Sequence, residues 1–183
     1  MKLHLGCGDK FLEGYIHVDI DEKDHIDFPK TDLRELPFKS NSVDLIYSCG
    51  NLEYYDQEEM PIILKEWCRV LKSGSILRLS VPNFDSIIKV YLNNGKNIHG
   101  EGILGPIFGK WKLNNGKYIY HKTVFNFDSL KKHLINVGFG NIRRYNHEDV
   151  MPKGFDDYSM AYVPYKDSSG IQISLNIEAT KKG

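Results

Sequence analysis

The stretch from Lys2 to Asp21, KLHLGCGDKFLEGYIHVDID, decides the fold expected for this chain. A short apolar run stops at Gly6-Cys7-Gly8, and a second run, Tyr15 to Ile20, ends in acids. Glycines directly after a strand let the backbone turn sharply and approach a ligand, and a carboxylate at the tip of the next strand can accept hydrogen bonds from ribose hydroxyls. The stretch therefore predicts strand, glycine turn, strand and acid, with a nucleoside as the ligand.

The link between these two strands is unusually short. It spans residues 6–14, whereas a parallel crossover usually takes a dozen or more residues including its helix. At most one helical turn fits there, so we expect a truncated first crossover helix. Alternation in the second strand places Asp19 at or near its C-terminal end.

The remaining chain alternates between strand and helix patterns. Residues 42–49, SVDLIYSC, form a nearly continuous apolar run typical of a central parallel strand. Apolar residues spaced by three and four predict a helix from Glu58 to Lys72, with Gly74 capping its end. Further strands are expected at 25–28, 75–81, 141–146 and 170–180, and helices at 85–92 and 129–137. The pattern predicts an α/β, doubly wound, mostly parallel sheet.

Residues 83–125 form the least regular segment, rich in glycine and aromatic residues. A loop of this length inside a compact domain is usually functional or disordered, and its aromatic content favours a folded lid. We therefore expect one domain, residues 1–183, with a lid or substrate-recognition insertion at about 83–125. The length of 183 residues suits one core.

Composition excludes several classes of protein. With 26% charged and 41% hydrophobic residues the chain has a globular balance, and no apolar run approaches the roughly 18 residues of a membrane span. The N-terminus lacks a secretory apolar stretch, and Cys7, Cys49 and Cys68 lack CxxC spacing, so a cytoplasmic location with reduced thiols is expected. No histidine pairs with another His or Cys at ligand spacing, so no metal site is expected.

Charge is zero overall but unevenly distributed. Residues 1–85 hold 10 basic and 16 acidic residues, whereas residues 86–123 hold six basic and one acidic. A neutral chain with one basic segment argues against broad nucleic-acid binding and fits an anionic small-molecule substrate. The sequence leaves a homo-oligomer open.

Several ordered motifs resemble the class I S-adenosylmethionine-dependent methyltransferases. They are LGCG, the acid in VDI, the acid followed by LPF at residues 32–38, the strand SVDLIYS, the helix ending RVLKSGSILRLSVP, and a late DSLKKHL with GF. The similarity covers most of residues 2–145. It implies a seven-stranded Rossmann-like methyltransferase sheet with an antiparallel C-terminal strand, and S-adenosyl-L-methionine as cofactor with S-adenosyl-L-homocysteine as product.

The resemblance also implies which residues bind the cofactor. It places Gly6, Cys7 and Gly8 beneath the methionine and ribose portion of the cofactor, and Asp19 with its neighbour Ile20 at the ribose hydroxyls. It places Asp32 and Leu33 at the adenine edge. It places the tip of the central strand, with Ser48, Cys49 and Asn51, at the methyl-donor end.

The chain departs from the family pattern at three positions. His4 stands where an acid often binds the amino group of the cofactor's methionine, Lys10 where a third glycine is common, and Tyr54 where many relatives have histidine. The chain also resembles a compact subset found with sugar and polysaccharide biosynthesis genes, through GYIHVDI, DDYSMAYVP and ISLNIEATK. This second resemblance implies a sugar or nucleotide-sugar substrate.

Methyl transfer from a sulfonium requires an aligned nucleophile and one base. His121, which ends the basic aromatic segment, is the first candidate, because an unperturbed imidazole titrates near neutral pH. Glu53 and Asp56, just beyond the central strand, are alternatives, and each of the three also has an ordinary structural interpretation.

Two functions therefore remain open. The first is an S-adenosylmethionine-dependent methyltransferase acting on an oxygen or nitrogen of a small molecule. The second is a cofactor-binding or partner-subunit scaffold without catalysis, whose truncated crossover leaves a sheet face for another chain. A nucleic-acid methyltransferase is disfavoured by the sequence after the central strand, and a nicotinamide dehydrogenase is disfavoured by Phe11, where G-x-G-x-x-G needs its last glycine.

Overall fold

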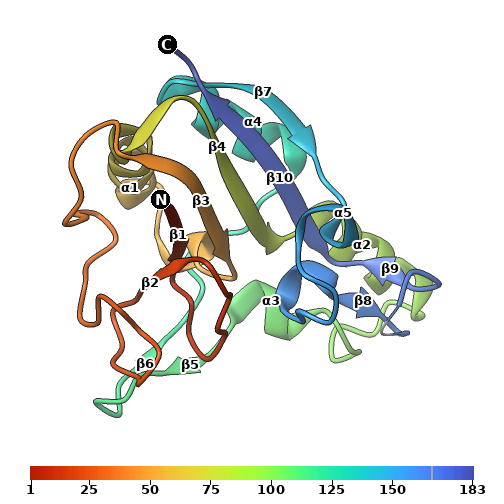
Figure 1. Cartoon of the computed structure of the whole chain (residues 1–183). Coiled ribbons are helices and arrows are strands. Elements are labelled where there is room, and N and C mark those ends of the chain that lie inside the picture. The colour runs from red at the N-terminus through yellow and green to blue at the C-terminus, as the bar shows by residue number, and fades with distance from the viewer. Residues whose placement is uncertain (166) are drawn as a thin grey trace.

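In this computed structural model the described residues, 1–165 and 167–183, form a six-stranded central sheet in the order β2-β1-β3-β4-β10-β7 (Figure 1). Strand β10 is antiparallel to both of its neighbours, whereas the pairings β2-β1, β1-β3 and β3-β4 are parallel. This confirms the mostly parallel sheet with an antiparallel C-terminal strand. The strands are β1 (Lys2–Leu5), β2 (Ile16–Val18), β3 (Val43–Cys49), β4 (Leu71–Pro82), β7 (Phe139–Arg144) and β10 (Ser174–Lys181).

The prediction of seven strands was wrong for the described residues. The strand expected near His25 to Phe28 is reduced to one isolated bridge between Phe28 and Val18, in which the Phe28 N–H donates to the His17 carbonyl at 3.0 Å. Pro29 follows directly and has no N–H with which to continue the ladder.

The crevice of the sheet lies between β1 and β3. Strand β1 has β2 on one side and β3 on the other, so the chain order reverses at β1. Ligands of doubly wound sheets bind at such a switch point. Strand β3 is central and almost wholly buried, as its apolar run predicted. No helix lies between β1 and β2 in this described stretch, in agreement with the short link.

One face of the sheet packs against α1 (Glu59–Val70) and α4 (Phe127–Asn136). The predicted apolar stripe of α1 is buried there. The predicted cap at Gly74 was wrong, because Leu71 is already extended and begins β4, so Gly74 lies within that strand at a φ of 79°. Helix α4 begins two residues earlier than predicted, because Asn126 forms a capping box with Ser129.

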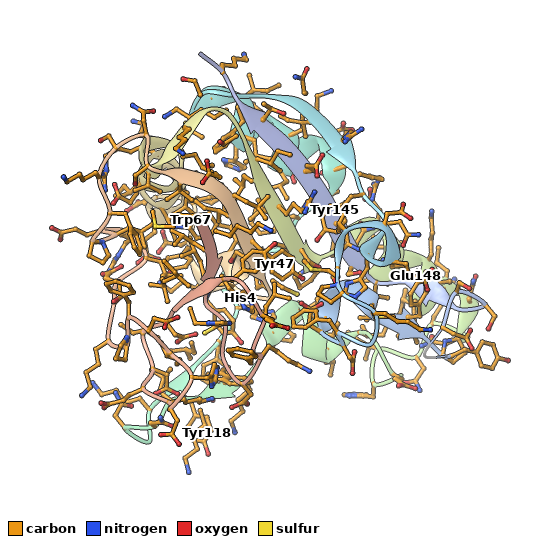
Figure 2. All side chains as sticks on the ribbon, viewed as in Figure 1. His4, Tyr47, Trp67, Tyr118, Tyr145 and Glu148 are labelled. Atoms are coloured by element: carbon orange, nitrogen blue, oxygen red, sulfur yellow. The ribbon has the colours of Figure 1, made fainter. Side chains whose placement is uncertain are left out.

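The opposite face of the sheet is polar. Alternation along β10 turns Asn176 and Glu178 to this side, where Ser80 donates to Asn176 at 2.8 Å and Arg78 pairs with Glu178 at 2.8 Å. The segment 145–160, which contains α5 (His147–Val150) and the 3-10 helix η2 (Tyr158–Met160), covers part of it. Figure 2 labels His4 and Tyr47 on this face, with ring centroids 5.3 Å apart. A polar, partly covered face does not have the character of an obligate apolar interface.

The insertion is folded and packs against the C-terminal segment. Its elements are α2 (Phe84–Asn93), α3 (Leu104–Phe108) and a hairpin of β5 (Trp111–Lys112) and β6 (Tyr118–Ile119). The ribbon β8 (Tyr162–Val163) and β9 (Ile171–Gln172) joins it through a small core of Ile87, Val90, Ile103, Val163 and Ile173. The hairpin lies below β2 in Figure 1, and its tip is fixed by the Asn114 N–H, which donates to Asp21 Oδ1 at 2.9 Å.

No helix in the described part of the chain has the length and apolar character needed to cross a membrane.

Candidate active site

A cavity of about 520 Å³ opens at the carboxyl ends of β1 and β3, at the reversal of chain order. Its volume is in the range of small-molecule and cofactor sites. The hairpin closes it on the far side through Trp111, Leu113 and Ile119. Seven of the ten predicted cofactor residues line it: Gly6, Cys7, Gly8, Asp19, Ile20, Cys49 and Asn51.

The glycine turn brings β1 and β3 into close contact. Gly6 has a φ of 64°, and a Cβ there would lie 2.1 Å from the Asn51 side-chain nitrogen. Gly8 has a φ of 56°, and a Cβ there would lie at an ordinary contact distance of 3.6 Å from the Trp111 ring. Both positions therefore require glycine for conformation, and Gly6 requires it for space as well.

Asp19 is positioned by the backbone. Its Oδ2 accepts from the Gly8 N–H at 2.8 Å and its Oδ1 accepts from the Asp21 N–H at 2.8 Å. The residue is only 7% exposed and lines the cavity. Each carboxylate oxygen keeps a second lone pair, so this arrangement can accept from a pair of ligand hydroxyls.

Three buried polar atoms at the cavity have no hydrogen-bond partner among the described residues: His4 Nδ1, Asn51 Oδ1 and Glu53 Oε2. Burial, aided by the neighbouring His17, lowers the pKa of His4 to about 3, so its imidazole is neutral. Burial raises the pKa of the Cys7 thiol to about 12, which excludes a thiolate nucleophile at neutral pH. Unpartnered polar atoms in the same cavity as Asp19 fit a ligand with several hydrogen-bonding groups, as the predicted cofactor has.

The other three predicted cofactor residues do not line this cavity. The Arg34 guanidinium forms a bidentate pair with Asp32 and lowers the pKa of that carboxyl. Leu33 is buried and its carbonyl accepts from Trp67 Nε1 at 3.0 Å, while Ser48 donates to the Leu5 carbonyl at 2.9 Å. An adenine contact through Asp32 stays a prediction, and it requires Arg34 to share that carboxylate.

His121 and Glu53 come together at the cavity. His121 Nε2 lies 3.8 Å from Glu53 Oε1, and the two side chains are 9% and 2% exposed. His121 Nδ1 is 2.9 Å from the Pro106 carbonyl, which can only accept, so Nδ1 carries the proton and Nε2 has the free lone pair. Burial lowers the pKa of His121 and raises that of Glu53 to about 8, so at neutral pH both groups are uncharged and form no ion pair.

The local fold holds this pair firmly. Glu53 lies in the 3-10 helix η1 (Leu52–Tyr54), and its carbonyl accepts from the backbone N–H groups of Lys122 and Thr123 at 2.8 and 3.2 Å. Gly109, at a φ of 48°, packs so closely on the imidazole that a Cβ would lie 2.3 Å from the His121 ring. The insertion and the tip of β3 are thus joined where the two side chains meet.

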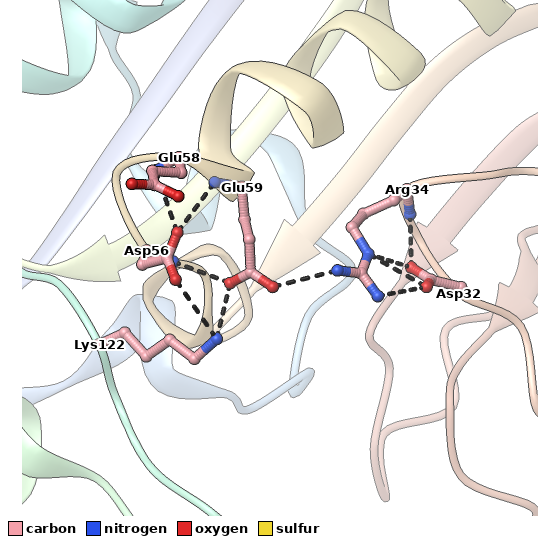
Figure 3. Close-up of polar contacts among 6 residues, drawn as sticks. All are labelled: Asp32, Arg34, Asp56, Glu58, Glu59 and Lys122. Carbon is pink, nitrogen blue, oxygen red and sulfur yellow. Dashed lines mark hydrogen bonds and ion pairs between the residues drawn. The ribbon is translucent and has the colours of Figure 1, made fainter.

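Asp56, the third predicted base, does not line the cavity. Its Oδ1 accepts from the Glu59 N–H at 2.9 Å, and Glu59 Oε2 accepts from the Asp56 N–H at 3.1 Å, which is a reciprocal cap of α1. Figure 3 shows that Glu59 pairs with both Arg34 and Lys122, and that Lys122 also lies 3.7 Å from Asp56, which links the segment after β2, the start of α1 and the end of the insertion. These contacts favour a structural role for Asp56.

Several cavity residues were not predicted from the sequence. They come from the insertion and the C-terminal segment, and the main ones are Pro106, Trp111 and Tyr158. The only available signals were the aromatic content of the insertion and the DDYSMAYVP motif, and neither indicates a position relative to the sheet. Within the described residues, no group of three His, Cys, Asp or Glu side chains is placed to hold a metal ion.

Comparisons with known proteins agree with this geometry. Residues 3–79 match a family model described as a methyltransferase domain. A SAM-dependent methyltransferase from Archaeoglobus fulgidus has a TM-score of 0.59 at 18% identity, over 98% of this chain and 85% of that one. A SAM-dependent methyltransferase from Methanosarcina mazei has a TM-score of 0.57 at 19% identity, over 99% of this chain and 92% of that one. No curated protein sequence matches the chain significantly.

A third structure contains a bound cofactor product. The 1,6-didemethyltoxoflavin-N1-methyltransferase of Burkholderia thailandensis, with S-adenosylhomocysteine bound, has a TM-score of 0.55 at 13% identity, over 100% of this chain and 71% of that one. The chain has the Rossmann-like fold of the SAM-dependent methyltransferases. The domain match and these structures support S-adenosyl-L-methionine as the cofactor.

Proposed function

We propose that this protein transfers a methyl group from S-adenosyl-L-methionine to an oxygen or nitrogen of a small molecule. The observation that carries the proposal is the pairing of a glycine and Asp19 cradle with the buried His121 and Glu53 pair in one cavity. The alternative of a scaffold without catalysis does not account for the unpartnered Glu53 carboxyl oxygen inside that cavity.

The residues have separate roles in this proposal. Gly6 and Gly8 let the cofactor approach the backbone, Asp19 accepts from its ribose hydroxyls, and Asn51 Oδ1 and His4 Nδ1 accept from its amino group. The bound cofactor supplies an electrophilic methyl group on a sulfonium, which needs no further activation. His121 Nε2 takes the proton of the acceptor, because it is the free lone pair of a neutral imidazole.

The resemblance to the sugar-associated subset offers one candidate for the acceptor, a sugar or nucleotide-sugar. The positions of the lysines do not favour its anionic form. Lys110 and Lys112 lie against the Tyr118 ring and Lys122 pairs with Glu59, so these three are engaged away from the cavity. Lys10 is the lysine that lines it among the described residues.

A methyl-transfer assay tests the proposed function. The protein, purified without added ligand, is examined by native mass spectrometry for carried-over cofactor. It is then incubated with methyl-labelled S-adenosyl-L-methionine and a panel of sugars, nucleotide-sugars and amines. We expect labelled product from at least one acceptor and loss of that product in His121→Ala. Absence of both cofactor binding and transfer would contradict the proposal.

A further inference from the structure

A second cavity, of about 990 Å³, adjoins the first. The two share three wall residues, Pro106, Asp157 and Tyr158. Its lining residues come from α5, η2, β8 and the insertion. Figure 1 shows α5 and β8 on the same side of the molecule. We call it the outer chamber and the first cavity the inner chamber.

The shared wall is ordered by hydrogen bonds. Tyr47 donates to Asp157 Oδ2 at 2.5 Å, and the Ser159 N–H donates to Asp157 Oδ1 at 2.9 Å. The Tyr158 hydroxyl donates to the Ile173 carbonyl at 3.3 Å. The wall thus presents a fixed carboxylate and a fixed ring to both chambers.

The wall also touches the proposed base. The Pro106 carbonyl accepts from His121, and the pKa of Tyr158 is raised by its burial and, to a smaller extent, by the nearby Glu53 carboxyl group. Glu53 is 1% exposed, and its Oε2 has no partner among the described residues. An acceptor that occupies the outer chamber and reaches over the wall would therefore meet a buried carboxyl that lacks a hydrogen bond.

The outer chamber combines an apolar lining with an excess of acids. Its apolar and aromatic members include Met151, Phe155, Met160, Tyr162, Val163 and Ile173. Among the described residues, four carboxylates line it, Glu101, Glu148, Asp156 and Asp157, against one lysine, Lys153. Figure 2 shows Glu148 on α5, on the opposite side of the molecule from the hairpin that carries Tyr118. Within residues 1–165 and 167–183, Glu101, Glu148 and Asp156 form no ion pair, so their charge is free to attract a cation.

We infer that the outer chamber binds the methyl acceptor, and that this acceptor is a small molecule with an apolar body and a cationic amino group. This inference rests on the proposed function and names its substrate class. The ammonium group first passes one proton to His121 Nε2, which frees the nitrogen lone pair. This lone pair then forms the nitrogen–methyl bond as the carbon–sulfur bond breaks, and the products are a methylammonium group and S-adenosylhomocysteine. An anionic acceptor would instead meet four carboxylates at the chamber.

Binding of matched probes tests the inference. The probes are 2-phenylethylamine, 2-phenylethanol and 3-phenylpropanoate, which share one body and differ in charge. Affinities are measured by ligand-observed NMR with the inner chamber saturated by S-adenosylhomocysteine. We expect the amine to bind about threefold to tenfold more tightly than the alcohol, as partly exposed charge pairs allow, and the carboxylate to bind most weakly. Equal affinities, or tighter binding of the carboxylate, would overturn the inference.

A double variant tests whether the acids of the outer chamber cause the preference for the amine. Glu148→Gln with Asp156→Asn should lower amine affinity to that of the alcohol and leave alcohol binding unchanged. Glu35→Gln with Asp24→Asn, two exposed acids outside both chambers, is the matched control and should preserve the amine preference. An unchanged preference in the first variant would overturn the inference. Titration of S-adenosylhomocysteine in the same samples separates the two claims, because failure of that titration contradicts the proposed function itself.

Discussion

Glu53 shows how burial sets the chemistry of a single residue. Its carboxyl is buried, one oxygen has no partner among the described residues, and its pKa is raised from 4.5 to about 8. The folded protein therefore holds this proton more tightly than the unfolded chain does. The contribution to the free energy of unfolding is complete below pH 4.5 and is lost as pH rises toward about 8.

Glu53→Gln should remove this pH dependence, because an amide does not ionise. We expect the wild type to lose up to about 1.4 kcal/mol of stability per pH unit within that window, relative to the variant. Urea unfolding of both proteins at pH 5, 6.5 and 8 measures the difference. Parallel loss of stability in the two proteins would show that Glu53 is not a buried, protonated acid.

His121 is the residue on which the proposed proton transfer depends. Because burial lowers its pKa, the basic form is present at neutral pH, and the rate should fall only at pH values below 6.5. His121→Ala should reduce methyl transfer about 100-fold to 10,000-fold, the usual contribution of a general base. His99→Ala, at an exposed histidine of the same insertion, is the control. A rate in His121→Ala equal to that of the control would exclude His121 as the base.

At the scale of elements, the turn between α3 and β5 determines where the imidazole lies. Gly109→Ala places a methyl group where the His121 ring now packs and strains a backbone at positive φ. We expect loss of methyl transfer with S-adenosylhomocysteine binding retained. Gly116→Ala has comparable backbone strain, at a φ of 83°, and no atom within 4 Å of its Cβ. If both variants have the same activity, the close packing at Gly109 has no role in positioning the base.

The hairpin of β5 and β6 contributes to the lining of the inner chamber, and we expect it to cover the bound ligand. Trp111 lies over Gly8, with Lys23 against its ring at 5.4 Å, and the hairpin tip is bonded to Asp21. Trp111→Ala should therefore speed the dissociation of S-adenosylhomocysteine, which stopped-flow displacement measures. Tyr118→Ala, on the same hairpin but outside the cavity, should leave the dissociation rate unchanged. Equal rates in the two variants would contradict a covering role for Trp111.

At the scale of the whole molecule, sequence patterns predicted the helices and strands that depend mainly on their own residues. The apolar run of β3, the stripe of α1 and the alternation of β10 each predicted an element that the structure contains, and the strand expected at 170–180 is divided into β9 and β10. The end of α1 was misplaced, because a glycine after a helix can cap it or lie within the next strand. The residues near Phe28 were predicted to form a strand but form a single bridge to Val18, because the same sequence pattern is compatible with either structure.

The sequence predicted the parts of the candidate site that lie at the ends of sheet strands, but not the parts that come from the insertion and the C-terminal segment. Asp19 and the glycine turn were found because the ends of adjacent strands must meet. Pro106 and Tyr158 reach the same cavity through the packing of the insertion on the C-terminal segment, which no local pattern encodes. Asp56 was proposed as a base from its position beside the strand tip, and its backbone contacts favour helix capping.

The central claim is that the inner chamber binds S-adenosyl-L-methionine through Asp19. Calorimetric titration of S-adenosylhomocysteine into the wild type, Asp19→Ala and the exposed-acid control Asp24→Ala tests it most directly. We predict binding to the wild type and control, and a loss of about tenfold to a hundredfold or more in Asp19→Ala, because hydrogen bonds to a charged acceptor are removed. Absence of binding to the wild type at millimolar ligand, or unchanged affinity in Asp19→Ala, would contradict the claim.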